Sequence, residues 1–279
     1  MKLTVICLTY NHEPYIERAL RGFVNQVTDF DFEVIVGDDA STDRTADLIR
    51  RYADLYPDRI KPVLREKNLG VIENERDVYQ QIKSEYIIFC EGDDYWCNDL
   101  FLSQGVAFLD AHQDCVMYCG NTLWNFVEEG RQHLGQKNLK SGWFSVKDDV
   151  YLHTSARIMR RQKKMPAADL YMFYYFLTQG RCYYHNDLVS VYTITGKGDW
   201  SGFSREKQDQ LNKGAYLALN EFLAYQYDDV LTKHIIKNKR YRQILALVKK
   251  IIGPQQFWEH YRERCGLSDA EIIWVEEGQ

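Results

Sequence analysis

The sequence has no surplus of basic residues and no long apolar run. Its 35 Lys and Arg stand against 40 Asp and Glu, which gives a net charge of −5. This balance argues against a nucleic-acid binder, because such proteins need clustered positive charge to displace phosphate counterions. No apolar stretch approaches the roughly 20 residues that cross a bilayer, and the first residues lack a signal-peptide pattern. We therefore expect a cytosolic protein.

Cysteine is also scarce. The 279 residues contain seven, an odd number and too few for a disulfide-stapled scaffold, so we expect them reduced and mostly buried. Cys115 and Cys119 have a C-x3-C spacing, but no second pair or His cluster completes a four-ligand zinc site. A chain of this length can bury a full core, and it is typical of one large domain or of a domain with an appendage.

Apolar runs alternate with helix-periodic stretches over the first hundred residues. This pattern predicts parallel strands joined by crossover helices. The expected strands are residues 3–9, 32–37, 60–64 and 86–90. Further on we expect a helix over 101–111, a strand over 115–121, a loop-rich stretch to about 145, a helix over 169–178 and a strand over 189–194. From about residue 203 only helical periodicity is present, which predicts a helical appendage.

Three of these strands end in polar loops. Tyr10-Asn11 follows the first strand, Asp38-Asp39 follows the second, and Glu91-Gly92-Asp93-Asp94 follows the strand over 86–90. Ligands of open α/β sheets collect at the carboxyl ends of the strands. The sequence therefore predicts a binding site at this edge.

Asp93 and Asp94 are adjacent carboxylates in a loop that has no Lys or Arg. Two such anions repel one another unless a cation lies between them. A Mg²⁺ or Mn²⁺ ion that holds a diphosphate is one solution, since these ions take one or two carboxylates and fill their shells with phosphate and water. The alternative is a surface turn or a helix cap, which are common places for Asp.

Five blocks follow one another along the sequence: VICLTYNHEPYIERAL, VIVGDDASTDRT, NLGVIEN, EYIIFCEGDDYW and MPAADLYMFYYFLTQGRCYYHNDLVSVY. In this order they resemble a family 2 glycosyltransferase of the GT-A fold. The resemblance implies a mostly parallel, Rossmann-like central sheet flanked by helices. It implies a catalytic domain over 1–202, with a nucleotide-binding part (1–100) and an acceptor-binding part (101–202), followed by a helical C-terminal extension (203–279).

The resemblance also implies nucleotide-binding roles at the matching positions. Tyr10 resembles the aromatic residue that packs on the base, and Asp39 resembles the carboxylate that accepts a hydrogen bond from the base. An acceptor-only side chain facing a ring N–H suits uracil or thymine, and of the corresponding carriers we expect UDP. The full set of expected nucleotide contacts is Thr9, Tyr10, Asn11, Asp38, Asp39, Asn68, Gly70, Asn74 and Asp93.

Two further carboxylates match the reaction centre of the family. Asp94 corresponds to the ligand of the Mn²⁺ or Mg²⁺ ion, which neutralises charge on the diphosphate leaving group. Asp169 resembles the general base that deprotonates the acceptor hydroxyl, although the same position at a helix start suits a cap. One base and a metal-held leaving group imply direct displacement with inversion at the anomeric carbon.

The chain departs from the family pattern in one place. Thr193 and Thr195 stand where relatives often have an Arg and a His that hold the metal or diphosphate, and a hydroxyl is a weaker metal ligand than imidazole. Other candidate contacts to diphosphate or acceptor are Arg76, His153, Thr195, Lys197 and Trp200. No Q-x-x-R-W block follows Asp169, which argues against a processive polymerase.

Two stretches are rich in cations. Five of the eight residues over 157–164 are Lys or Arg, which by default indicates a solvated loop and otherwise a contact to an anionic acceptor. Residues 233–250 hold seven cations and no acid among apolar residues. That stretch suits a helix packed on the catalytic domain, or peripheral contact with an anionic membrane surface.

The implied activity is transfer of one sugar from a nucleotide diphosphate donor to a glycan or lipid-linked glycan acceptor in surface polysaccharide synthesis. A sugar nucleotidyltransferase is an alternative, but it would have a Gly-rich, basic loop after the first strand. A non-catalytic nucleotide- or glycan-binding module of the same fold is another. Homodimer formation is left open by the sequence.

Overall fold

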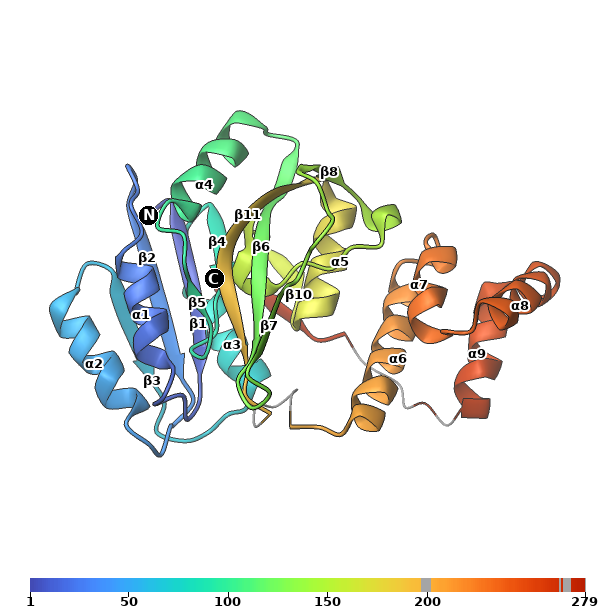
Figure 1. Cartoon of the computed structure of the whole chain (residues 1–279), viewed down its shortest axis with the longest axis horizontal. Coiled ribbons are helices and arrows are strands. Elements are labelled where there is room, and N and C mark those ends of the chain that lie inside the picture. Colours follow the sequence, from blue (N-terminus) through green and yellow to red (C-terminus); the bar gives the residue numbers. More distant parts are fainter. Residues whose placement is uncertain (197–201, 266, 268–271, 279) are drawn as a thin grey trace. The chain divides into compact units, whose positions relative to one another are not determined.

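The chain folds into two compact units (Figure 1). The computed structural model describes residues 1–196, 202–265, 267 and 272–278. Unit 1 contains residues 1–145, 151–195 and 274–279, and unit 2 contains 146–150 and 196–273. These units differ from a single division after residue 202, because the last segment of the chain returns to unit 1. The assignment of 1–202 to catalysis stays a prediction.

Unit 1 is built on a ten-stranded sheet in the order β3-β2-β1-β4-β9-β6-β11-β5, with β7 paired to β6 and β8 to β11. The pairs within β3-β2-β1-β4 and the pair β6-β11 are parallel, whereas β9 and β5 run antiparallel to their neighbours. The strands of the sheet are β1 (Leu3–Thr9), β2 (Phe32–Asp38), β3 (Ile60–Leu64), β4 (Tyr86–Phe89), β5 (Tyr95–Trp96), β6 (Cys115–Phe126), β7 (Arg131–Leu134), β8 (Gly142–Phe144), β9 (Arg157–Arg160) and β11 (Arg181–Ile194). A separate antiparallel pair joins β10 (Lys164–Pro166) to β12 (Trp274–Glu276).

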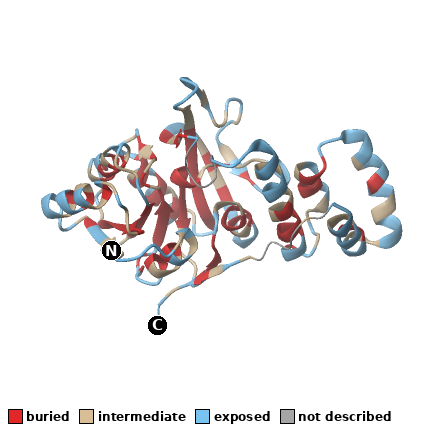
Figure 2. Cartoon of the chain, turned by 90° about the horizontal axis from the view of Figure 1, so that it is seen from below, coloured by how far each residue is buried: buried red, intermediate tan, exposed pale blue. Residues whose placement is uncertain are grey.

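Helices flank this sheet, which explains the uninterrupted apolar character of its central strands. Every residue of β1, β2 and β4 is buried, as Figure 2 shows for the central strands, and strands covered on both faces read as continuous apolar runs. One face packs against three helices in a single core. The helices of unit 1 are α1 (Ile16–Val24), α2 (Thr45–Leu55), α3 (Val71–Tyr79), α4 (Phe101–Ala111), α5 (Asp169–Gln179) and a 3₁₀ turn (Thr154–Ala156).

Unit 2 is helical. It contains a 3₁₀ turn (Val146–Asp148), α6 (Arg205–Phe222), α7 (Asp228–Ile235), α8 (Lys239–Ile252) and α9 (Pro254–Cys265). Its core comprises Leu217, Ile235, Ile236, Leu245, Phe257 and Trp258. Asp149 joins the short segment to α7 through His234, 2.7 Å away. Among the described residues, none of the helices combines the length and apolar character needed to cross a bilayer.

Three expectations about local structure are wrong. Strand β12 interrupts the purely helical C-terminal part, and β7 and β8 lie in the stretch expected to be loops. The cationic run over 157–164 is not a solvated loop, since it forms β9 and part of β10 and Arg157 is fully buried. The cysteine expectation is confirmed, because all seven are free and five are buried.

Candidate functional site

The carboxyl ends of β1, β2 and β4 meet at one edge of the sheet, because the three strands are parallel neighbours. Tyr10 follows β1 and is 45% exposed. Asn11 adopts a positive φ of 54°, and its side-chain oxygen accepts a hydrogen bond from the Thr42 N–H at 2.8 Å. Its own N–H donates to Ser41 Oγ at 2.8 Å. The loops after β1 and β2 are therefore tied together at Asn11, the residue next to the exposed Tyr10.

The two aspartates at the end of β2 are buried and organise the neighbouring loops. Asp38 accepts hydrogen bonds from the N–H and hydroxyl of Ser41. Asp39 accepts the Leu69 N–H at 2.7 Å on one oxygen and the Gly70 N–H at 2.8 Å on the other. The Asp39 carboxylate therefore holds the 68–70 loop, and its oxygens keep further lone pairs for a ligand.

Asn68 takes part in the same loop, but two other predicted residues lie away from it. Asn68 donates to the Asp39 backbone oxygen at 3.1 Å. Asn74 is 1% exposed, and its amide donates to the Gly37 carbonyl at 2.8 Å, which braces α3 against β2. Arg76 forms a surface ion pair with Glu73 one turn away. The structure therefore gives Asn74 and Arg76 partners within the protein.

The loop 91–94 after β4 packs tightly on the end of β1. A Cβ atom at Gly92 would lie 2.7 Å from Thr9 Oγ1 and 2.9 Å from His12 Nδ1, so only glycine fits there. Thr9 is itself 3% exposed and lies beneath this loop. Asp93 remains half-buried, with its carboxylate 4.0 Å from His12 Nε2. The packing fixes the backbone that presents Asp93 and Asp94.

Asp94 is 1% exposed, and one of its carboxylate oxygens has no hydrogen-bond partner among the described residues. Its Oδ1 accepts the Thr193 N–H at 2.9 Å, whereas no described residue forms a hydrogen bond with Oδ2. Within the part of the chain that the structure describes, the cation-capable group closest to this oxygen is His153 Nδ1, 3.6 Å from Oδ2. Burial raises the pKa of Asp94 well above its ordinary value, and the charges of Asp93 and Glu91 raise it further. An unpaired buried carboxylate oxygen is what a cation ligand requires.

His153 is a neutral side chain beside Asp94. Its ring stacks on Tyr192 at 4.1 Å between centroids, and its Nδ1 lies 2.8 Å from Ser155 Oγ. Burial, followed by the charge of Arg157, lowers the pKa of His153 to about 3. A neutral imidazole is the form that binds metals, so Asp94 and His153 are the residues here that could hold a cation.

Asp169 begins α5 and points its carboxylate at two partners. Tyr151 donates its hydroxyl to Oδ2 at 3.2 Å, and the Arg157 guanidinium lies 3.8 Å from Oδ1. Ala168, just before it, has a positive φ of 68°, a strained conformation for a residue with a Cβ atom. Desolvation raises the pKa of Asp169, while Arg157 and Tyr151 oppose this effect.

Asp94 and Asp169 belong to one electrostatic cluster. The charge of Asp169 contributes to the raised pKa of Asp94 and also to those of Glu75 and Glu91, which burial and this charge raise to about 8. The Thr154 hydroxyl reaches Glu91 at 3.4 Å. The charge of Asp169 therefore reaches Asp94 and two of the carboxylates near it.

The sequence alone did not identify several members of this cluster. Arg157 stands in a run of cations that predicts a solvated loop. The structure instead buries its guanidinium against the rings of Tyr151 and Phe173, which come from other segments of the chain. Glu75 and Tyr151 carried no signal, whereas Glu91 and His12 stood inside the quoted motifs. Thr195 directly follows β11 and is 9% exposed. Lys197 and Trp200 lie outside the described residues.

The described residues contain no cluster of three or more His, Cys, Asp or Glu side chains arranged to hold a metal ion by themselves. A cation here would therefore take Asp94 and, next to it, His153, and would need ligand oxygens to complete its shell. Mg²⁺ and Mn²⁺ bind nucleotides in this way. The donor set fits such an ion only together with a bound diphosphate.

Two of the relatives each match less than half of this chain. An uncharacterized protein of Mycobacterium tuberculosis is 43% identical over 128 residues, which are 46% of this chain and 37% of that protein. The poly(ribitol-phosphate) beta-N-acetylglucosaminyltransferase TarS of Staphylococcus aureus is 36% identical over 121 residues, which are 42% of this chain and 20% of TarS. The chain thus spans well under half the length of both relatives.

Solved structures support the expected fold. TarS 1–349 in complex with UDP-GlcNAc gives a TM-score of 0.58 at 22% identity, covering 79% of this chain and 67% of that one. The mannosyltransferase PcManGT of Pyrobaculum calidifontis, in complex with GDP-Man and Mn²⁺, gives 0.59 at 18% identity, covering 84% and 69%. These likenesses confirm the GT-A type α/β fold with a largely parallel central sheet. The family model described as glycosyl transferase family 2 matches residues 4–182, more than half of the sequence, so the chain belongs to that family.

Proposed function

We propose that this glycosyltransferase moves a single hexosyl unit from a UDP-sugar to an acceptor hydroxyl with inversion. The observation that carries the proposal is the unpaired, buried Oδ2 of Asp94 in the same carboxylate cluster as Asp169. Two ligand types in the solved relatives support a nucleotide donor: UDP-GlcNAc in TarS, and GDP-Man with Mn²⁺ in PcManGT.

The donor would bind along the edge where β1, β2 and β4 end. The exposed ring of Tyr10 offers a stacking surface for a base, and the Asp39-held loop borders the same edge. Asp93, half-buried after β4, would contact the ribose. A divalent cation held by Asp94 would neutralise the charge that develops on the diphosphate.

Asp169 would act as the general base. Its carboxylate takes the proton of the acceptor hydroxyl while that oxygen attacks the anomeric carbon, and UDP departs with the electron pair of the broken bond. The contacts of Arg157 and Tyr151 with the carboxylate would hold it in one orientation. A single displacement at the anomeric carbon gives inversion without a covalent enzyme intermediate.

The acceptor is proposed to be a glycan, free or lipid-linked, of a surface polysaccharide. TarS, whose name specifies a poly(ribitol-phosphate) acceptor, is the motivation for this class. The relatives are much longer than the matched part, so their acceptors are a guide to chemistry only.

Calorimetry with UDP, with and without Mn²⁺, tests the donor site. We expect binding that depends on the metal, is lost with EDTA, and is weakened at least tenfold by Asp94→Asn through loss of a charged ligand. UDP affinity that is the same with and without metal would favour a non-catalytic module. Turnover of a nucleoside triphosphate with a sugar phosphate would instead indicate a nucleotidyltransferase.

A further inference from the structure

Helix α8 presents a row of apolar side chains to solvent. Ile244, Leu247 and Ile251 are 59%, 62% and 82% exposed, and their spacing of three and four residues places them on one side of the helix. We call these three residues the α8 ridge. The buried residue of this helix is Leu245, which joins the core of unit 2 on another side. The ridge therefore has no packing role within unit 2.

Cations border the ridge. Lys239, Arg240 and Lys250 are exposed, and no ion pair to any of them is found in the described part of the chain. Arg240 lies one turn before Ile244, and Lys250 lies one turn after Leu247. All seven charged residues from 233 to 250 are positive. This arrangement places apolar contact area and unneutralised positive charge side by side.

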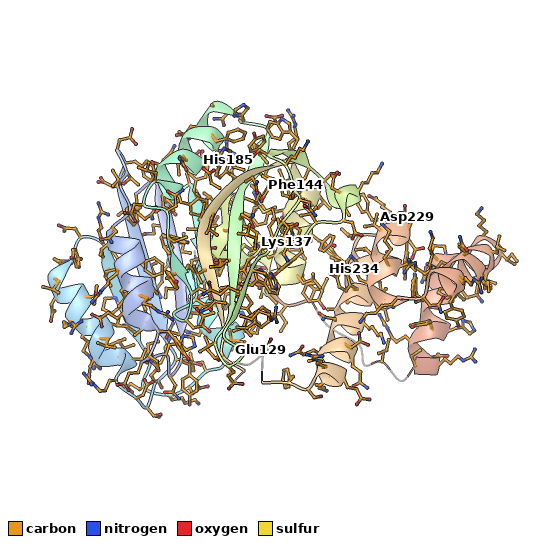
Figure 3. The ribbon with its side chains drawn as sticks, viewed as in Figure 1. Glu129, Lys137, Phe144, His185, Asp229 and His234 are labelled. Atoms are coloured by element: carbon orange, nitrogen blue, oxygen red, sulfur yellow. The ribbon has the colours of Figure 1, made fainter. Side chains whose placement is uncertain are left out.

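A cavity of about 610 Å³ adjoins the cationic side of α8 and reaches α7, where Figure 3 labels Asp229 and His234. Its lining includes five cations, Lys233, Lys239, Arg242, Lys249 and Lys250, against two acids. Two of these cations are already paired, Lys249 with Asp228 at 2.7 Å and Lys233 with Asp149 at 3.3 Å. Lys239, Arg242 and Lys250 then stand against Asp229 alone. The cavity therefore suits anionic groups such as phosphates.

We propose that the α8 ridge and its cations dock on the surface of an anionic lipid bilayer. Amphipathic helices with an apolar row and flanking Lys and Arg lie in the membrane interface, where each cation near an anionic surface strengthens binding about fivefold. The positive charge around the ridge favours an anionic bilayer over a second copy of this chain. A second copy bound through the same ridge would bring two sets of the unpaired cations Lys239, Arg240 and Lys250 together, and these sets would repel.

Flotation of the whole protein with vesicles tests this proposal without any sugar donor. We expect binding to phosphatidylcholine vesicles that contain about a quarter phosphatidylglycerol, little binding to phosphatidylcholine alone, and weakening as salt screens the charges. Replacing the three cations (Lys239→Glu, Arg240→Glu, Lys250→Glu) should weaken binding by about a hundredfold or more. Replacing the ridge (Ile244→Ser, Leu247→Ser, Ile251→Ser) should weaken it at least tenfold.

Matched controls come from α6 of the same unit. Leu211→Ser replaces an apolar side chain that is 37% exposed, and Lys207→Glu reverses an exposed cation. Both should bind vesicles like the wild type. Because all changed side chains are exposed, circular dichroism should report unaltered folding.

Three outcomes would overturn the proposal. One is equal binding to neutral and anionic vesicles, and another is wild-type binding by the folded ridge variant. The third is a dimer in analytical ultracentrifugation that the ridge variant dissociates, since the ridge would then be covered by a second copy. None of these outcomes bears on sugar transfer, so the two proposals fail separately.

Discussion

At the scale of single residues, the contacts of Asp169 allow its proposed role in catalysis to be tested separately from nucleotide binding. Its carboxylate lies at the start of α5 and contacts Tyr151 and Arg157, whereas most of the proposed nucleotide contacts lie in the loops after β1, β2 and β4. Asp169→Asn should therefore lower the transfer rate by 10² to 10⁴, the usual contribution of a general base, and leave UDP affinity within about twofold. UDP release with acceptor and calorimetry with UDP measure the two effects.

The matched control for this change is Asp187→Asn. Asp187 has a side-chain exposure of 48%, close to the 46% of Asp169, and it pairs with His185 rather than with Arg157. It should transfer sugar at the wild-type rate. If Asp169→Asn also kept that rate, Asp169 would be a helix cap and not the base.

The raised pKa of Glu75 predicts that the free energy of unfolding depends on pH. It is 5% exposed, and burial with the charges of Asp169 and Glu91 raises its pKa from 4.5 to about 8. The native protein thus keeps a proton that the unfolded chain has lost, so this stabilisation is complete below pH 4.5 and disappears as pH rises through 8. The free energy of unfolding of the metal-free protein should fall across this window, and Glu75 alone should contribute up to about 1.4 kcal/mol per pH unit.

Glu75→Gln should flatten this decline in urea unfolding measured from pH 5 to 8. Part of the slope should remain, because the pKa of Glu91 is also raised to about 8. Glu73→Gln, at an exposed position of the same helix, is the control and should follow the wild type. Identical slopes for Glu75→Gln and wild type would show that Glu75 is ionised in the folded protein.

Which site residues the sequence could predict depends on how local their placement is. Asp39 directly follows one apolar strand and Asp94 lies in the loop after another, so the rule about strand ends was enough to predict that both lie at one edge of the sheet. The burial of Arg157 could not be predicted, because its neighbours in sequence include other cations while its neighbours in space are aromatic rings and Asp169. Asn74 was predicted to bind nucleotide, but the helix turns its side chain inward to Gly37.

At the scale of elements, the start of α3 depends on a glycine. Gly70 has φ 83° and ψ 154°, a conformation that is almost restricted to glycine, and its N–H binds Asp39. Gly70→Ala should lower the free energy of unfolding by about 1–3 kcal/mol and weaken UDP binding through movement of the 68–70 loop. Urea denaturation and calorimetry measure the two effects.

Gly142 provides the comparison. An added Cβ meets nothing within 4 Å at either glycine, but only Gly70 has a positive φ. Gly142→Ala should therefore be nearly neutral. Equal losses from both substitutions would show that crowding, and not backbone conformation, sets the requirement at residue 70.

The elements predicted from the sequence are those with strong periodicity. Strand β1 and helix α4 have the expected bounds because a continuous apolar run and a complete apolar stripe define them. Strand β11 begins at Arg181, eight residues before the expected start, because its first half is polar and aromatic and pairs with β6 and β8. Strand β12 is three residues long, and its partner β10 lies about a hundred residues earlier, so no local pattern marks it.

At the scale of the whole molecule, β12 closes unit 1. Val275 is fully buried, and Glu277 pairs with Arg161 beside it. Val275→Ala should lower the free energy of unfolding by on the order of 2 kcal/mol through lost burial and a cavity. Val27→Ala, at a position that is 61% exposed, should change it by less than about 0.5 kcal/mol. Thermal unfolding of the two variants tests whether the last strand is part of the cooperative fold.

The pairing of β10 with β12 means that both ends of the 196–273 segment lead into unit 1. A protease nick at an exposed position of unit 2, such as Gln226, would leave two peptides still held together by that strand pair and by the core of unit 2. The nicked protein should migrate as two bands under denaturing conditions and elute as one particle in native buffer.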